Sequence, residues 1–248
     1  MRLQNKIAIV TGGGSGFGEG IVRKFVQEGA RVLIADRNFE GAERVAASLE
    51  GQAVPFEADV GSQGGFESIV EATRKSFGGL HILVNNAGVG HLPQPLEDVE
   101  EDIFDRVSSV NMKGIYFGAK AAVPHFKQQK YGAILNVAST GGVSPRPNLT
   151  WYNASKGWAI TATRGMAVEL APFGIRVNAI NPVAGDTPLL KTFMGDDTPE
   201  IRAKFLSTIP LGRFSTPEDM GNAAAFLCSD EASMITGVAM EVDGGRCI

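Results

Sequence analysis

The stretch KIAIVTGGGSGFGEGIVRKFVQEGARVLIAD, residues 6–36, decides the fold. Its apolar run at 7–10 is followed by a glycine-rich turn, a segment with the helical spacing of apolar residues, and a second apolar run at 32–35. This order predicts a strand, a turn, a helix and a second strand, the unit that holds a dinucleotide. Glycines suit such a turn because they reach positive φ without a Cβ clash and leave the backbone bare for a pyrophosphate.

Asp36 ends the second apolar run, eighteen residues after Gly18. A carboxylate at this position can accept hydrogen bonds from the ribose hydroxyls of an adenosine. The glycine spacing, Gly12-x-x-x-Gly16-x-Gly18, departs from the common G-x-G-x-x-G pattern. On this stretch alone, a glycine-rich turn in another kind of α/β protein therefore stays open.

Composition narrows the class of protein. A chain of 248 residues that is 44% hydrophobic can bury the core of one large α/β domain. A net charge of −4 gives no basic field for nucleic acid or an anionic membrane, so a small-molecule substrate is expected. Cys228 and Cys247 lie far apart without metal-type spacing, so we expect no metal site. The N-terminus enters the first apolar run without a signal segment, and a cytoplasmic location is expected.

Apolar and helix-period segments alternate along the rest of the chain. Further strands are expected at 53–56, 82–84, 133–138, 177–180 and 239–242, and further helices at 41–49, 62–77, 99–129, 152–171 and after Thr216. Pro124 predicts a kink in the long helical region, and Thr216-Pro217 predicts a capped helix start. Unbroken apolar strands suit a parallel sheet covered on both faces. The sequence therefore predicts a single doubly wound α/β domain over 1–248, with a variable segment at 183–207.

Polar residues stand at three places in apolar surroundings. Asn85-Asn86-Ala87-Gly88 follows a strand, where it could touch a cofactor or form a simple turn. Asn111 lies in an apolar helical segment, either as a structural hydrogen-bonding residue or as part of a catalytic site. Ser139 follows the strand at 133–138, at the sheet edge where open α/β sheets bind ligands.

The pair Tyr152-x-x-x-Lys156 is the most informative of the polar positions. Residues four apart on a helix share a face, so the phenol and the ammonium point the same way. A phenol with a pKa near 10 is a poor acid–base catalyst at neutral pH, and a nearby cation lowers that pKa. The spacing alone is also typical of an exposed helical pair, so its meaning depends on the other motifs.

Taken together, these residues resemble the short-chain dehydrogenase/reductase family over essentially the whole chain. The residues that match in family order are Thr11, Gly12, Gly16, Gly18, Asp59, Asn85 to Gly88, Asn111, Ser139, Tyr152, Lys156, Asn181 and Pro182. The resemblance implies a Rossmann-type fold and an oxidoreductase that transfers a hydride between a nicotinamide cofactor and a secondary alcohol or ketone.

The resemblance also implies a role for each residue. Tyr152 would be the general acid–base, Ser139 would hold the substrate oxygen, and Lys156 would lower the Tyr152 pKa and bind the nicotinamide ribose. Asn111 would anchor a water that links Lys156 to solvent. The cofactor-binding residues it implies are Gly12, Ser15, Gly16, Phe17, Gly18, Asp36, Arg37, Asp59, Val60, Asn85, Ala87, Gly88, Tyr152, Lys156, Pro182, Val183 and Thr187.

Val183 is a departure from the family pattern, which has glycine after the proline at the end of the sixth strand. Valine does not easily take positive φ, so the path of this loop and the role of Thr187 against the nicotinamide carboxamide are less defined. Candidate substrate-pocket residues are His91, Gly141, Gly142, Val143, Arg146, Trp151, Leu189, Leu190, Phe193 and Met194. Arg146 could meet an anionic substrate group or be a solvated loop residue.

Asp36 favours NAD over NADP, because a 2′-phosphate would face its carboxylate. Two other functions stay open: a reductase of carrier-bound 3-oxoacyl thioesters, and a non-catalytic NAD(H)-binding redox sensor on the same fold. The helix at 154–171 is apolar nearly all round and carries only Lys156, Arg164 and Glu169 as charged residues. Since one face of an outer helix covers its own sheet, the other face predicts a homo-oligomer, and the family resemblance implies a homotetramer.

Overall fold

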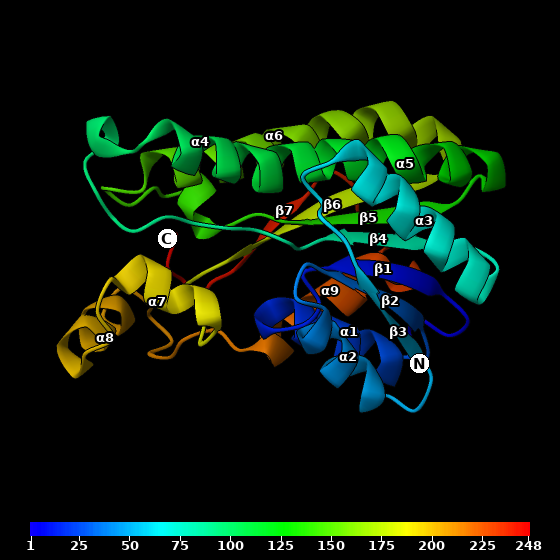
Figure 1. Cartoon of the computed structure of the whole chain (residues 1–248), viewed down its shortest axis with the longest axis horizontal. Helices are drawn as coiled ribbons and strands as arrows, with labels where there is room; N and C mark the ends of the chain where they lie inside the picture. The colour runs from blue at the N-terminus through cyan, green and yellow to red at the C-terminus, as the bar shows by residue number, and fades with distance from the viewer.

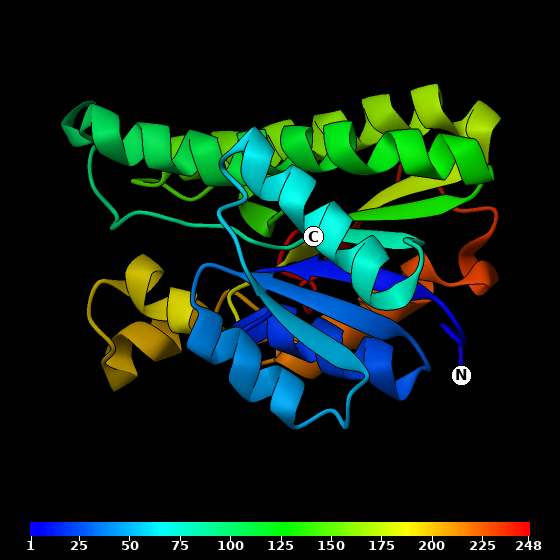
Figure 2. The ribbon, with the colours of Figure 1, turned by 45° about the vertical axis from the view of Figure 1, so that its right-hand side comes forward.

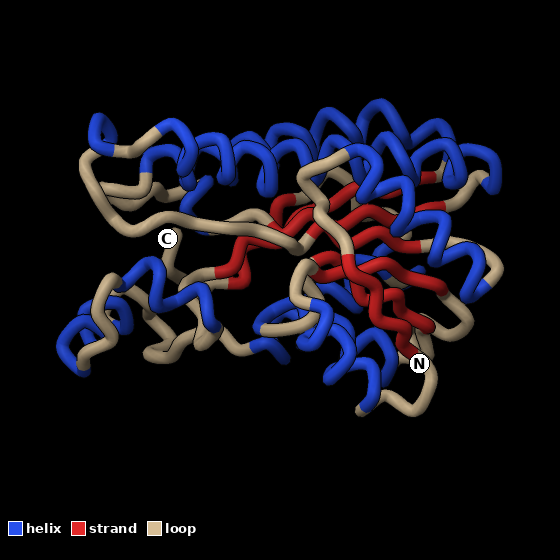
Figure 3. The backbone as a smooth tube through the Cα atoms, viewed as in Figure 1, coloured by secondary structure: helices blue, strands red, loops and turns tan.

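The computed structural model describes all 248 residues, and its seven parallel strands form one sheet in the order β3-β2-β1-β4-β5-β6-β7 (Figure 3). The strands are β1 Ile7–Thr11, β2 Arg31–Asp36, β3 Ala53–Glu57, β4 Ile82–Asn85, β5 Gly132–Val137, β6 Ile175–Pro182 and β7 Ala239–Val242. The predicted doubly wound α/β fold is confirmed.

Helices cover both faces of the sheet (Figure 1). They are α1 Gly16–Gln27, α2 Phe39–Ala47, α3 Gln63–Phe77, α4 Glu101–Ser108, α5 Gly114–Gln129, α6 Thr150–Leu170, α7 Pro188–Met194, α8 Pro199–Leu206 and α9 Pro217–Cys228. In Figures 1 and 2, α1, α2 and α9 lie on one face, and α3, α5 and α6 on the other. The short helices α7 and α8 project from one end of the sheet (Figure 1). None of the helices has the length and apolar character needed to cross a membrane.

Two hydrophobic cores lie on opposite faces of the sheet, and β1 contributes to both. Ala8 and Val10 belong to the core that includes α1, α2 and α9, whereas Ile9 belongs to the core under α3, α5 and α6. Side chains alternate between the faces of a strand, so a strand covered on both sides has an apolar residue at every position. This is why the strands appear in the sequence as unbroken apolar runs.

The chain winds outward from β1 to β3 on one side, then returns to β4 on the other side of β1. The connections that leave β1 and β4 therefore diverge to opposite sides of the sheet. In open α/β sheets this divergence leaves a crevice at the carboxyl ends of the strands, where ligands bind.

Two predicted regions differ in the structure. The region at 99–129 is interrupted by a π-helical turn at Ser109–Lys113, which the sequence did not predict, and Pro124, where a kink is expected, lies inside helix α5. The segment at 183–207 contains α7 and α8, each with proline in its first turn after a threonine N-cap. The same Thr-Pro signal that predicted α9 thus also marks these two helices.

Candidate active site

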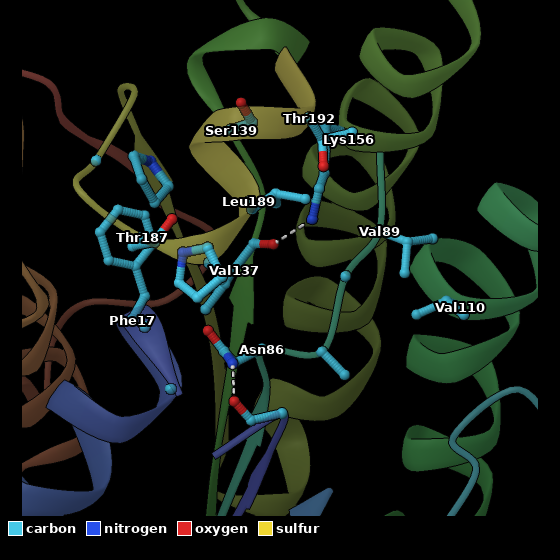
Figure 4. A pocket seen from close by; sticks show the side chains of 18 of the residues that line it. Phe17, Asn86, Val89, Val110, Val137, Ser139, Lys156, Thr187, Leu189 and Thr192 are labelled. Atoms are coloured by element: carbon cyan, nitrogen blue, oxygen red, sulfur yellow. Dashed lines mark hydrogen bonds between the residues drawn. The ribbon is translucent and has the colours of Figure 1, made fainter. Parts of the chain in front are cut away.

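A cleft of about 490 Å³ opens at the carboxyl ends of the strands (Figure 4). Its walls come from the glycine turn after β1, the loops after β2 to β6, the start of α6, and the helices α7 and α8. Most of the predicted cofactor residues line it, namely Gly12, Ser15, Gly16, Phe17, Gly18, Asp36, Arg37, Asp59, Val60, Ala87, Gly88, Tyr152, Lys156, Pro182, Val183 and Thr187.

The glycine turn requires glycine at specific positions. Gly12 and Gly16 have positive φ angles of 64° and 53°, and a Cβ on Gly18 would overlap the carbonyl oxygen of Gly12. The turn leads into the N-terminus of α1, where the first backbone N–H groups have no intrahelical acceptor. The N-cap residue Ser15 makes no side-chain capping bond. These free donors and the bare backbone fit a pyrophosphate.

Asn86 fastens this turn to the loop after β4. Its Nδ2 donates to the carbonyl oxygens of Thr11 at 2.8 Å and Gly12 at 3.1 Å, and the Thr11 hydroxyl accepts from the N–H groups of Asn86 and Ala87. Asn85, in contrast, does not line the cleft. It ends β4 and donates to Asn136 Oδ1 at 2.9 Å between neighbouring strands. Strand alternation turns Asn86 rather than Asn85 toward the cleft, and the predicted contact of Asn85 with the cofactor stays a prediction.

The Asp36 carboxylate is fixed at the end of β2. Its Oδ2 accepts from the Gly14 N–H and its Oδ1 from the Asn38 N–H, both at 2.9 Å. Arg37, the next residue, is exposed and also lines the cleft. A carboxylate held in this way still has free lone pairs for ribose hydroxyls.

Tyr152, Lys156 and Ser139 all line the cleft, and the Ser139 side chain hydrogen-bonds Tyr152. Tyr152 and Lys156 are only 7% and 6% exposed, and the Lys156 ammonium lies 5.9 Å from the centre of the Tyr152 ring. Lys156 Nζ donates to the carbonyl oxygen of Val137 at 2.9 Å (Figure 4). The Ser139 hydroxyl accepts from the Gly141 N–H at 3.0 Å. The helical spacing of the tyrosine and lysine thus has the predicted effect of placing both on one face of α6.

Burial dominates the protonation of both groups on α6. It raises the pKa of Tyr152 to about 12, although the Ser139 side chain acts in the opposite direction through a hydrogen bond. Burial also lowers the pKa of Lys156 to about 8. Burial thus outweighs the one contact that lowers the Tyr152 pKa, the Ser139 hydrogen bond, and the predicted lowering of this pKa by Lys156 stays a prediction.

Asn111 lies in the π-helical turn, is 2% exposed and does not line the cleft. Its Oδ1 accepts from the Val89 N–H, while its Nδ2 donates to the Val89 carbonyl and to Ser155 Oγ. The side chain thus holds the Val89 loop, which does line the cleft, against α6. Its predicted role in anchoring a water stays a prediction.

The substrate-pocket predictions divide into two groups. Gly141, Arg146, Leu189, Leu190 and Phe193 line the cleft, whereas His91, Gly142, Val143, Trp151 and Met194 do not. His91 is buried, and Trp151 donates to the Leu96 carbonyl and packs against Phe104.

Sequence reasoning missed Val89, Leu149, Asn153, Thr192 and Phe205 among the lining residues, and it named Asn86 only within a motif that could touch a cofactor. Leu149 precedes Tyr152 by three residues, a helical spacing that could have indicated it, whereas Asn153 directly follows Tyr152 and carries no such signal. No local signal marks Phe205, which reaches the cleft from α8.

Val183 lines the cleft without positive φ and is 4% exposed. The departure from glycine is therefore accommodated by a backbone that valine adopts freely. Thr187 caps α7 and lies against the glycine turn, since a Cβ on Gly16 would be 3.3 Å from its Cβ. Figure 4 shows Thr187 beside Phe17 on the same wall of the cleft.

This sheet order, with a glycine turn on α1, a buried Tyr-Lys pair and a half-buried Ser139 at the strand ends, is typical of nicotinamide-dependent dehydrogenases. The family model described as enoyl-(acyl carrier protein) reductase matches residues 12–246. The chain belongs to the short-chain dehydrogenase/reductase family and is an oxidoreductase.

Curated relatives and solved structures match over nearly the full chain. The chain is 52% identical to 4-formylbenzenesulfonate dehydrogenase of Comamonas testosteroni, with 100% of both chains covered. It is 38% identical to meso-2,3-butanediol dehydrogenase of Serratia marcescens, over 99% of this chain and 96% of the relative. The structure of a 3-ketoacyl-(acyl-carrier-protein) reductase from Brucella melitensis complexed with NADH superposes with a TM-score of 0.95 at 52% identity, over 99% of this chain and 100% of the other.

Proposed function

We propose that the protein is an NAD-dependent oxidoreductase that transfers a hydride between the nicotinamide and a secondary alcohol or ketone, with Tyr152 as the acid–base. The observation that carries this proposal is the convergence of Ser139, Tyr152 and Lys156 in the cleft that also contains the glycine turn. A bound nicotinamide would accept or donate the hydride, which no side chain can do.

The residues present fit that cofactor. The glycine turn and the N-terminus of α1 would hold the pyrophosphate, and Asp36 the adenosine ribose. Lys156, whose ammonium donates to the Val137 carbonyl, would bind the nicotinamide ribose. The Val183–Thr187 loop would lie over the nicotinamide. NAD rather than NADP is supported by the fixed carboxylate of Asp36 and by the NADH in the 52% identical Brucella melitensis structure.

Tyr152 would move the proton of the reacting oxygen. During oxidation its phenolate takes the hydroxyl proton, while Ser139 donates a hydrogen bond to the oxygen that becomes a carbonyl. A buried phenol with a raised pKa is a weak base at neutral pH. The positive charge of Lys156 therefore has to favour the phenolate while the substrate is bound. Asn111 would act indirectly, by holding the Val89 loop against Ser155 of α6.

The names of the relatives support an alcohol or carbonyl substrate. One acts on 4-formylbenzenesulfonate and another on meso-2,3-butanediol, so the carbonyl or carbinol carbon is the shared reacting group. A second candidate is reduction of 3-oxoacyl thioesters, which the name of the Brucella melitensis structure favours. Comparing turnover of an acetoacetyl thioester with that of small alcohols separates the two. A non-catalytic redox sensor would bind NADH and turn over neither.

The substitution Tyr152→Phe tests the proposal. It removes the proton-transferring oxygen and keeps the ring, which packs on Phe193 at 4.8 Å between ring centres. We expect turnover below a few per cent of the wild-type rate with NADH affinity largely kept, measured by steady-state kinetics and by NADH fluorescence. Residual turnover above that level would rule out the role given to Tyr152.

Assembly as a homotetramer is part of the proposal. On α6 the residues Ala154, Trp158, Gly165 and Val168 are exposed in a single chain, Val168 by 80%. A second subunit that packed on this face would bury them, and the small residues would allow close approach. The cytoplasmic location stays a prediction.

A further inference from the structure

Two arginine side chains come together beside the part of the cleft formed by α8 and the segment before α6. Arg146 lines the cleft, and its guanidinium stacks on the Phe205 ring at 4.3 Å from the ring centre. Arg246, near the C-terminus, donates from Nη1 to Ser144 Oγ at 3.1 Å. Ser144 lies two residues before Arg146 in the chain. The two guanidinium groups are close enough for the charge of Arg246 to lower the pKa of Arg146, in addition to the larger effect of burial.

Neither arginine has a carboxylate partner. Salt bridges are formed by Arg2, Arg23, Arg44, Arg202 and Arg213, but not by Arg146 or Arg246. The acidic residue closest to Arg246 along the chain is Asp243, and its carboxylate accepts from the backbone N–H groups of Gly245 and Cys247 instead. The Nε of Arg246 is buried without any acceptor. Two like charges with an unsatisfied donor are unfavourable unless an anion joins them.

The Arg146 side chain is held in place and does not behave as a solvated loop residue. It is half-buried, stacks on Phe205 and donates from Nη2 to Thr208 Oγ1 at 3.3 Å. Its backbone carbonyl accepts from Asn153 Nδ2 at 2.8 Å, which ties the segment to α6 one residue from Tyr152. A planar guanidinium fixed in this way suits recognition of an oxyanion with two acceptor oxygens.

The rest of this part of the cleft is apolar. Leu149, Leu189, Leu190, Phe193 and Phe205 line it, and the Phe193 ring packs on the Tyr152 ring at 4.8 Å. Flat aromatic walls favour a flat apolar body, since aromatic rings stabilise each other in tilted and offset contacts. The chain as a whole carries a net charge of −4, so the positive charge here is local.

We infer that Arg146, supported by Arg246, binds a carboxylate or sulfonate of the substrate, and that the substrate is an aromatic alcohol or carbonyl compound bearing that anion away from its reacting carbon. The aromatic body would lie against Phe193 and Phe205. This inference rests on the proposed function for the reacting end of the molecule, and on the two arginines for the anionic end.

Calorimetric titration of the NADH-loaded protein tests the anionic end without turnover. The probes are benzenesulfonate and benzoate, each compared with its uncharged amide, benzenesulfonamide or benzamide. We expect each anion to bind about tenfold to a hundredfold more tightly than its amide, because hydrogen bonds to charged groups contribute roughly 1.5–3 kcal/mol. Arg146→Gln should remove this preference, Arg146→Lys should keep part of it, and Arg246→Gln should reduce it.

Arg106→Gln is the matched control, since Arg106 is exposed on α4 and forms no salt bridge. Its anion preference should equal that of the wild-type protein. Equal affinity for anion and amide, no binding of either anion, or a preference that survives Arg146→Gln would overturn the inference. Failure of the proposed function has a different signature, namely no binding of NADH and no turnover of charged or uncharged alcohols. The anion titration repeated without NADH shows whether the arginines bind the anion independently of the cofactor.

Discussion

Removal of the Asp36 carboxylate should narrow a strong preference for NAD over NADP. Two backbone N–H groups hold this carboxylate at 2.9 Å each, so it has little freedom to turn away from a 2′-phosphate. Two unit charges about 4 Å apart at an effective dielectric near 20 repel by about 4 kcal/mol. Solvent at this partly exposed edge leaves about 3 kcal/mol of that repulsion, which corresponds to a preference in kcat/KM of at least roughly a hundredfold.

The assay is steady-state kcat/KM with each cofactor for the wild-type protein, Asp36→Ala and Asp36→Asn. The asparagine variant keeps the size of the side chain and removes its charge, so it separates repulsion from loss of packing around Gly14. Both variants should narrow the ratio mainly by improving NADP, because the exposed guanidinium of Arg37 is then free to meet the phosphate. A wild-type protein that uses both cofactors equally well, or variants with an unchanged ratio, would refute the assignment of Asp36.

Three further predictions follow from burial and packing. The wild-type protein should gain stability relative to Lys156→Met as the pH rises from about 8 toward 10.5. In this range the lysine is neutral in the folded protein and still protonated in the unfolded chain, because burial lowers its pKa from 10.5 to about 8. A difference in the free energy of unfolding in urea that stays constant from pH 7 to 10 would contradict this. Gly18→Ala should lower the free energy of unfolding by about 1–3 kcal/mol and weaken NADH binding, since its Cβ overlaps the Gly12 carbonyl, whereas Gly64→Ala, with open space around it, should do neither. Light scattering at micromolar concentration should give a multiple of the 26.2 kDa chain mass, and a monomer mass would exclude the homotetramer.

Much of the fold could be predicted from the sequence because the strands are buried on both faces. That burial leaves unbroken apolar runs, and the turns between them carry glycine and capping residues. The strand β6 was predicted too short, at 177–180 instead of Ile175–Pro182. Arg176 and Asn181, near its two ends, resemble loop residues in the sequence, but they pair in register with Ala133 of β5 and Glu241 of β7.

The candidate site could be predicted where its residues follow local patterns, as in the glycine turn and the Tyr152–Lys156 pair. Choosing between Asn85 and Asn86 needed the last strand position of β4, which the sequence defines only to within a residue or two. The contributions of Phe205 and Arg246 could not be foreseen, because they reach Arg146 from α8 and the C-terminus. The raised pKa of Tyr152 depends on burial, which spacing along a helix does not reveal.

The segment 185–215, which carries α7 and α8, begins and ends at residues that lie side by side. Gly185 and Ser215 form a parallel bridge, and Ser215 also bonds the backbone of Val183 and Ala184. Because both ends are fixed together, a longer or shorter excursion would change the entropy of loop closure only slightly. The length of the segment between them can therefore vary at little cost, whereas Thr187 and Phe193 within it stay constrained because they lie against the glycine turn and the Tyr152 ring.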